Sequence, residues 1–195
     1  MYNVSIIGAS GYTGAQLVEL VQQHPELTLC GTYVSSNSAD ANKPIGELHG
    51  KLAHVDSTLI PISDSILESL AHDVDFIFLA TPHEASHDWM PLLTSGSAKV
   101  LDLSGAFRLK DTEVFEAFYG FPHKQQESLD NAVYGLAEWY SSSIEQAKII
   151  AVPGCYPTAS LSALKPLGEN NLLDNAVRPV INAVSGVSGA GRKAS

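Results

Sequence analysis

The chain has 195 residues, of which 45% are hydrophobic and 16% charged, so it is long enough and apolar enough to bury a core. Its formal net charge of -10 argues against nucleic acid or an anionic membrane surface as a partner, and no apolar run reaches the roughly 18 residues of a membrane span. Two cysteines, Cys30 and Cys155, are too few for a disulfide scaffold and suit a reducing cytoplasm.

Apolar runs typical of buried strands alternate along the chain with helical patterns. Strands are predicted over residues 4–8, 27–34, 58–62, 74–80, 99–103, 149–152 and 180–184. Helices are predicted over residues 14–23 and 66–70, from about Glu84, and around Leu161, Leu164 and Leu167, with a polar loop over residues 35–52. This alternation predicts an α/β fold with a doubly wound, Rossmann-type parallel sheet, in which ligands bind at the carboxyl ends of the strands.

A glycine-rich loop follows the first predicted strand. Residues 8–14 read Gly-Ala-Ser-Gly-Tyr-Thr-Gly, a G-x-x-G-x-x-G spacing that opens a helix. Glycines at such a turn let the backbone approach a pyrophosphate at the helix N-terminus. The loop therefore predicts a dinucleotide site, with a plain strand-to-helix turn as the alternative.

The end of the second strand indicates which dinucleotide is bound. Folds that prefer NAD usually carry an acidic residue there, but no acid stands between Glu26 and Asp40. The segment instead contains Ser35 and Ser36, and no arginine. Without a carboxylate to repel a 2′-phosphate, NADP is favoured over NAD.

Cys155 follows the strand at residues 149–152, within Pro-Gly-Cys-Tyr-Pro-Thr, and precedes a helical pattern. A helix N-terminus stabilises a thiolate, and a thiolate at the carboxyl edge of a nucleotide-binding sheet is a candidate nucleophile. The alternative for Cys155 is a small buried cysteine without a chemical role, which is how we interpret Cys30. A nucleophilic cysteine beside a dinucleotide predicts attack on an acyl group followed by hydride reduction to an aldehyde.

His83-Glu84-Ala85-Ser86-His87 matches the H-E-x-x-H pattern of zinc peptidases. Thr81 and Pro82 directly follow a strand, so His83 lies at a helix start rather than on an established helical face. Met90 stands where the extended zinc motif requires glycine. No metal site is therefore predicted.

Six stretches together resemble one family, the N-acetyl-gamma-glutamyl-phosphate reductases of arginine biosynthesis. They are GASGYTGAQL, VDFIFLATPHEASHD, VLDLSGAFRLKD, YGLAEW, AVPGCYPTA and SGVSGAGRKA, and they run in family order over nearly the whole chain. The resemblance implies NADPH-dependent reductive dephosphorylation of an acyl phosphate through a cysteine thioester, with release of inorganic phosphate. It also implies that the TPHEASH segment lies near the cofactor and holds no zinc.

The resemblance assigns roles to individual residues. It makes Cys155 the nucleophile. The implied NADP(H) ligands are Gly8, Ser10, Gly11, Tyr12, Thr13, Gly14, Ser35, Ser36, Pro82, Ser188 and Gly189. The implied substrate-binding residues are Ser104, Arg108, Ser185, Gly186 and Arg192. An arginine suits an acyl phosphate because its guanidinium donates two hydrogen bonds to an oxyanion.

The resemblance also predicts the domain organisation. Residues 1–152 would form the NADP-binding domain, and residues 153–195 would begin a second α+β substrate domain of a truncated chain. The family's acid/base histidine would lie beyond residue 195. Within the chain, His83 and His123 are the nearest candidates for that role, but we interpret both as solvated or hydrogen-bonded surface histidines. We expect the chain alone to bind NADPH without turnover, and a homo-oligomer at full length. An aspartate-semialdehyde dehydrogenase-like enzyme and a non-catalytic NADPH-binding module are the alternatives.

Overall fold

A seven-stranded parallel sheet forms the centre of the computed structural model, which describes residues 1–174 and 176–192. The strands are β1 (Tyr2–Ile7), β2 (Leu27–Val34), β3 (Leu59–Pro61), β4 (Phe76–Leu79), β5 (Lys99–Asp102), β6 (Val133–Tyr134) and β7 (Ile149–Ala151). Their order is β3-β2-β1-β4-β5-β7-β6, and every neighbouring pair is parallel. The chain reverses its direction of winding between β1 and β4, where doubly wound sheets bind ligands. The predicted fold class is confirmed.

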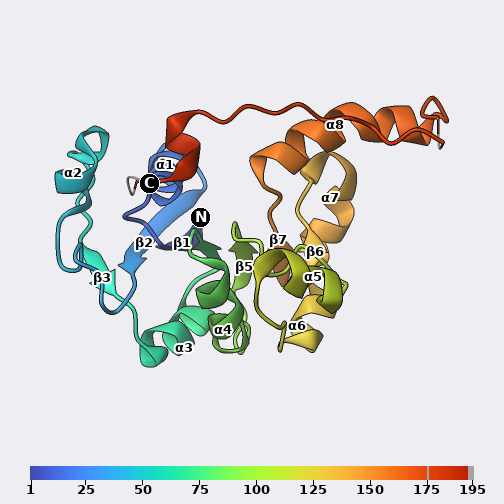
Figure 1. Cartoon of the computed structure of the whole chain (residues 1–195). Helices are drawn as coiled ribbons and strands as arrows, with labels where there is room; N and C mark the ends of the chain where they lie inside the picture. The colour runs from blue at the N-terminus through green and yellow to red at the C-terminus, as the bar shows by residue number, and fades with distance from the viewer. Residues whose placement is uncertain (175, 193–195) are drawn as a thin grey trace.

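Helices cover both faces of this sheet (Figure 1). They are α1 (Tyr12–Gln23), α2 (Ile45–Leu48), the 3-10 helix η1 (Gly50–Leu52), α3 (Asp64–Asp73), α4 (His83–Leu93), α5 (Thr112–Tyr119), α6 (Gln126–Asn131), α7 (Ala137–Gln146), α8 (Cys155–Glu169) and the 3-10 helix η2 (Val187–Ala190). Within the described ranges, no helix combines the length and the apolarity needed to cross a membrane.

The core consists of two apolar clusters, one on each face of the sheet. Ile6 and Ile7 are consecutive and both fully buried, and they belong to different clusters because successive strand residues point to opposite faces. The Ile6 cluster includes residues of α1, α2 and η1, whereas the Ile7 cluster includes residues of α3, α4 and α6. Burial on both faces explains why the central strands are almost entirely apolar.

Two predictions about the region around β2 are wrong. Cys30 is exposed rather than buried, because the register of β1 and β2 passes from Val4↔Leu29 to Ser5↔Gly31 and leaves Cys30 as the extra residue of a bulge. The loop predicted over residues 35–52 contains α2 and η1, which form where Ile45 and Leu52 are buried.

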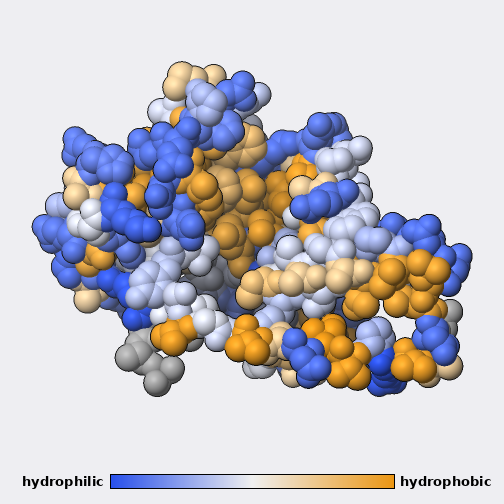
Figure 2. Space-filling model, turned by 90° about the horizontal axis from the view of Figure 1, so that it is seen from above, coloured by the Kyte–Doolittle hydropathy of each residue, from blue (hydrophilic) through white to orange (hydrophobic). Residues whose placement is uncertain are grey.

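The strand predicted over residues 180–184 is also wrong. This segment has no regular structure, and Val180 and Val184 are 86% and 96% exposed. A strand requires a partner for its backbone groups, and the described residues provide none here because the segment runs free of the sheet from α8 to α1 (Figure 1). Apolar residues gather along this segment and the outer part of α8 (Figure 2).

Candidate active site

The glycine loop between β1 and α1 has the close packing expected of a dinucleotide site. Gly8 has φ +89°, and a Cβ placed there would lie 2.2 Å from the Ala80 carbonyl oxygen. A Cβ on Gly14 would lie 2.2 Å from the Gly8 carbonyl oxygen, whereas one on Gly11 would lie an ordinary 3.6 Å from it. Gly8 and Gly14 are thus required by the protein's own packing, while Gly11 leaves room for a ligand above the turn.

The N-terminus of α1 offers free donors at this loop. The first helical hydrogen bond runs from the Ala15 N–H to the Gly11 carbonyl, at 2.9 Å. The amides of Tyr12, Thr13 and Gly14 precede it and therefore lack a helical acceptor. These groups and the positive end of the helix dipole suit a pyrophosphate, so the loop fits the predicted cofactor. Pro82 is the N-cap of α4, in the loop that packs against Gly8.

The fold places two basic side chains, Lys43 and Arg192, in the region that follows β2. Ser35 and Ser36 are exposed there, as expected of ligands. Asp40 forms ion pairs with Lys43 at 3.3 Å and with Arg192. Burial raises the pKa of Asp40, but hydrogen bonds from Lys43 and Arg192 outweigh it and lower that pKa overall. The fold thus brings an arginine to a site where the local sequence has none.

The structure does not bring Arg192 to the other predicted substrate residues. Asp40 follows β2, whereas Arg108 follows β5, and β1 and β4 lie between these two strands. Ser188 lines a cleft with Tyr12, which places the predicted Ser188–Gly189 ligands beside the glycine loop. Ser185 and Gly186 lie in the exposed segment immediately before η2.

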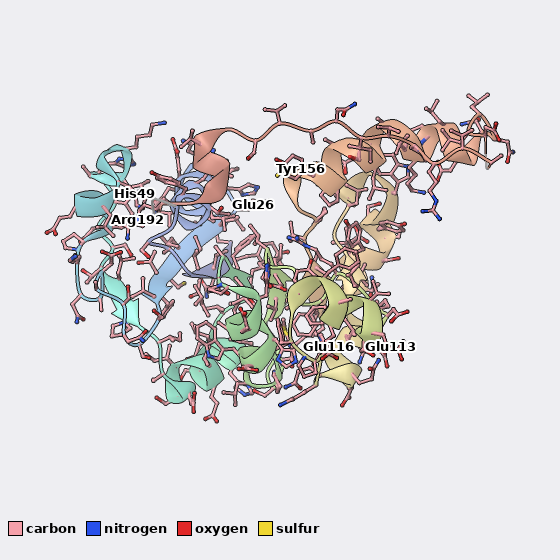
Figure 3. The ribbon with its side chains drawn as sticks, in the orientation of Figure 1. Glu26, His49, Glu113, Glu116, Tyr156 and Arg192 are labelled. Carbon is pink, nitrogen blue, oxygen red and sulfur yellow. The ribbon has the colours of Figure 1, made fainter. Side chains whose placement is uncertain are left out.

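His49 belongs to the same cleft and was not predicted. Its Nε2 lies 2.9 Å from the Ser10 carbonyl oxygen, and its ring packs edge-on against Tyr12 at 6.3 Å. His49 and Arg192 lie close together beside α1 and α2 at the left of Figure 3, apart from Tyr156 at the start of α8 near the middle of the picture. No sequence signal could have identified a lone histidine in a polar segment 39 residues from its partner.

Cys155 and Arg108 lie together at the ends of β5 and β7. Cys155 is the first residue of α8, and its thiol is exposed. The Arg108 Nε donates to the Val152 carbonyl at 2.8 Å, and Nη2 donates to the Leu103 carbonyl at 2.7 Å. A Cβ on Gly154 would lie 3.2 Å from Arg108 Nη1, so the guanidinium lies against the backbone just before Cys155.

Asp102 organises the loop after β5, and sequence reasoning did not select it. Its carboxylate accepts hydrogen bonds from the Ser104 N–H and hydroxyl, both at 2.9 Å. Burial raises the pKa of Asp102, against the hydrogen bonds from Ser104. The Ser104 hydroxyl oxygen also accepts the Ala106 N–H at 3.1 Å. Ser104 is 4% exposed, so its hydroxyl shapes the loop rather than facing open space.

The two histidines of the H-E-x-x-H string use their ring nitrogens inside the protein. His83 Nδ1 accepts the Gly105 N–H at 2.8 Å, and His87 Nε2 accepts the Lys124 N–H at 2.9 Å. The remaining nitrogen of His87 lies 2.8 Å from an Asp88 carboxylate oxygen. These bonds leave His87 without a free lone pair for zinc, and the described residues contain no group of three or more potential metal ligands.

His123 lies next to His87, with ring centres 4.7 Å apart. Burial lowers the pKa of His123 from its ordinary 6.5, and His87 lowers it further. The unfolded chain therefore takes up a proton near pH 6.5 that the folded chain does not, so the free energy of unfolding falls as the pH drops through 6.5. Urea denaturation on both sides of that pH measures the effect. His123→Gln, which retains a donor to the Ala106 carbonyl, should flatten the profile; an unchanged slope would refute the assignment to His123.

A second cleft, of about 1170 Å³, lies at the amino ends of β6 and β7, away from the glycine loop and Cys155. Pro91 and Thr94 at the end of α4 and Ile149 at the start of β7 are among its lining residues. Ligands of doubly wound sheets bind at the carboxyl ends of the strands, so the cleft's size does not make it the active site.

Comparison with known proteins agrees with this geometry. Residues 3–147 match the family description "Semialdehyde dehydrogenase, NAD binding domain", and residues 155–195 match "Semialdehyde dehydrogenase, dimerisation domain". The chain belongs to the semialdehyde dehydrogenase family. Its match to the first of these domains covers strands β1 to β6 and the glycine loop, and Cys155 is the first residue of the second match.

Curated members of the family are similar over the whole chain. The N-acetyl-gamma-glutamyl-phosphate reductase of Alteromonas mediterranea is 77% identical over 195 residues, and that of Vibrio vulnificus is 55% identical over 196. Each alignment covers 100% of this chain and 58% of the relative. The chain therefore spans a little over half the length of these proteins.

Solved semialdehyde dehydrogenases share the fold. Aspartate semialdehyde dehydrogenase II from Vibrio cholerae is 21% identical with a TM-score of 0.54. Aspartate semialdehyde dehydrogenase with NADP from Candida albicans is 14% identical with a TM-score of 0.56. Each superposition covers 87% of this chain and 47% of the other.

Proposed function

We propose that the chain is the cofactor-binding and nucleophile-bearing part of an NADPH-dependent N-acetyl-gamma-glutamyl-phosphate reductase. The observation that carries the proposal is the position of Cys155. Cys155 is exposed at the start of α8, the preceding Gly154 lies against Arg108, and both follow the carboxyl ends of strands, as the glycine loop does. The names of the similar curated proteins support the choice of substrate.

The first chemical step follows from this arrangement. The Cys155 thiolate attacks the acyl carbon of the acyl phosphate, a carbon–sulfur bond forms, and the bond from that carbon to the phosphate oxygen breaks. Inorganic phosphate leaves and the acyl group stays on Cys155 as a thioester. Arg108 Nη1 lies against Gly154, the residue before Cys155, and from there its positive charge would stabilise the phosphate oxygens as they gain negative charge.

The cofactor of the proposal is NADPH, which supplies the hydride that reduces the thioester to an aldehyde. The glycine loop would hold the pyrophosphate, and Ser35 and Ser36 would donate to the 2′-phosphate. Lys43 and Arg192 make this end of the sheet more favourable for a second phosphate than the local sequence implies. The NADP-containing Candida albicans structure shares the fold and is consistent with this choice.

The proposal includes a domain boundary, an assembly and a location. We place the boundary at residues 152 and 153, because every residue of α8 is at least partly exposed while β7 is buried. The dimerisation-domain match and the exposed apolar residues after α8 support a homo-oligomer of the whole protein. A biosynthetic reductase with two free cysteines would work in the cytoplasm.

Paired titrations of NADPH and NADH into this chain, followed by nicotinamide fluorescence, test the cofactor assignment. NADPH is expected to bind at least roughly tenfold more tightly, because a hydrogen-bonded 2′-phosphate contributes about that factor or more. The matched control is Ser35→Ala with Ser36→Ala, which should weaken NADPH binding and leave NADH binding unchanged. Equal affinities for the two cofactors in the unmodified chain would contradict the assignment.

A further inference from the structure

His83, at the start of α4, reaches across to the loop that carries Arg108. Its Nδ1 accepts the N–H of Gly105 at 2.8 Å, although the two residues are 22 positions apart. The Tyr119 ring packs edge-on against His83 with centres 4.8 Å apart. A Cβ on Gly105 would lie 2.3 Å from that same tyrosine ring, so His83, Gly105 and Tyr119 pack as one unit.

The amides of Ser104 and Ala106 are bound by side chains of the loop itself, whereas the Gly105 amide donates to His83 of α4. The Asp102 carboxylate accepts the Ser104 N–H, and the Ser104 hydroxyl oxygen accepts the Ala106 N–H. Gly105 is buried, so its amide would lack a partner inside the protein if His83 did not accept its proton. Buried amides without a partner are strongly disfavoured, and the loop would shift to bring this one to water.

Movement at Gly105 would displace the guanidinium beside Cys155. Arg108 follows Gly105 by three residues, and its N–H donates to the Gly105 carbonyl at 3.4 Å. Its side chain lies against Gly154 and donates to the Val152 carbonyl. An error of about 1 Å in the position of a catalytic group lowers rates substantially.

We propose that His83 is a positioning residue, in its neutral form with the proton on Nε2. It holds Gly105 and so places Arg108 beside the phosphate group of the acyl phosphate that Cys155 attacks. This inference rests on the proposed function, since it assigns a role in phosphate binding at the same site. It gives one histidine of the H-E-x-x-H string a task that needs a free lone pair and no metal.

The hydrogen bond is tested first, by nitrogen-15 NMR of this chain. The His83 Nδ1 signal is expected in the range of an unprotonated nitrogen, and the Gly105 amide is expected to exchange slowly with solvent. In His83→Leu the Gly105 amide should exchange rapidly, while in His83→Asn, whose side-chain oxygen replaces Nδ1 as acceptor, it should stay protected. A protonated Nδ1, or a Gly105 amide unaffected by the leucine, would overturn the proposal.

The consequence for chemistry is tested with acetyl phosphate, a minimal acyl phosphate, by measuring the acetylation rate of Cys155 by mass spectrometry. His83→Leu should lower this rate by roughly 10- to 100-fold, and His83→Asn should recover most of it. Alkylation of Cys155 by neutral iodoacetamide needs no arginine and should be equal in all three proteins. If Cys155 were acetylated equally fast in His83→Leu and in the unmodified chain, the positioning role would be overturned. If Cys155 of the unmodified chain were not acetylated at all, the proposed function would be overturned, and the NMR result alone would decide whether His83 binds Gly105.

Discussion

Gly14→Ala is expected to lower the free energy of unfolding by about 2–3 kcal/mol and to abolish saturable NADPH binding. The added Cβ would lie 2.2 Å from the Gly8 carbonyl oxygen and 2.6 Å from the Ala9 Cα. Both contacts are with backbone that is fixed by the β1–α1 turn, so α1 must move away from the sheet. Urea denaturation measures the loss of stability, and nicotinamide fluorescence measures the loss of binding.

Gly11→Ala is the matched control for this prediction. Its Cβ would meet the Gly8 carbonyl oxygen at 3.6 Å, which is an ordinary contact, so the free energy of unfolding should change by no more than about 1 kcal/mol. NADPH binding should still weaken, because the new methyl group occupies the space above the turn. A Gly14→Ala protein as stable as its parent would refute the close approach of α1 to β1. Undiminished binding by Gly11→Ala would mean that the pyrophosphate does not lie on this loop.

The buried strands and the loops that follow them could be predicted, because they depend on the apolar pattern of the local sequence. Strands β1 and β4 pack against the apolar clusters on both faces and β7 is fully buried, so these strands appear as apolar runs. The glycine loop and Cys155 were found because each directly follows such a strand. Their position relative to the sheet follows from the general rule for parallel sheets, without any knowledge of side-chain contacts.

The region between β5 and β7 was mostly missed. It contains short helices whose ends are set by capping rather than by a long apolar period. The Asp111 carboxylate accepts the Glu113 and Val114 amides to begin α5, and Gly120 ends that helix with φ 81°. Strand β6 has two residues, both partly exposed, and such a short segment has no recognisable periodicity.

The features of the site that escaped prediction depend on tertiary contacts. Arg192 was predicted as a substrate ligand, but it pairs with Asp40 across 152 positions, and His49, which was not predicted, reaches Ser10 across 39. The bulge that exposes Cys30 is likewise a property of how β1 and β2 pair, not of either strand alone. The mistaken strand at residues 180–184 has the same origin, because apolar β-branched residues favour a strand only where a partner is available.

Cys155→Ser is expected to reduce the reductase activity by at least about 10³-fold, the scale on which loss of a covalent nucleophile acts. A serine hydroxyl is not ionised at neutral pH and attacks an acyl phosphate far more slowly than a thiolate. The substitution removes no buried packing, since Cys155 is exposed at the start of α8, so the fold should be unchanged. NADPH oxidation with N-acetyl-gamma-glutamyl phosphate measures the effect, in a polypeptide that continues this chain with the remaining C-terminal residues of the Alteromonas mediterranea relative.

Cys30→Ser is the matched control, because Cys30 is the other cysteine of the chain and is also exposed. It lies on the β2 bulge, away from the β5 and β7 ends, so activity and acetylation by acetyl phosphate should match the parent protein. In the 195-residue chain, acetylation should disappear from Cys155→Ser and persist in Cys30→Ser. If Cys155→Ser kept its activity, or if the acetyl group appeared on Cys30, the thioester at the start of α8 would be the wrong intermediate. Loss of activity with unchanged NADPH binding would separate the chemical role of Cys155 from the cofactor role of the glycine loop.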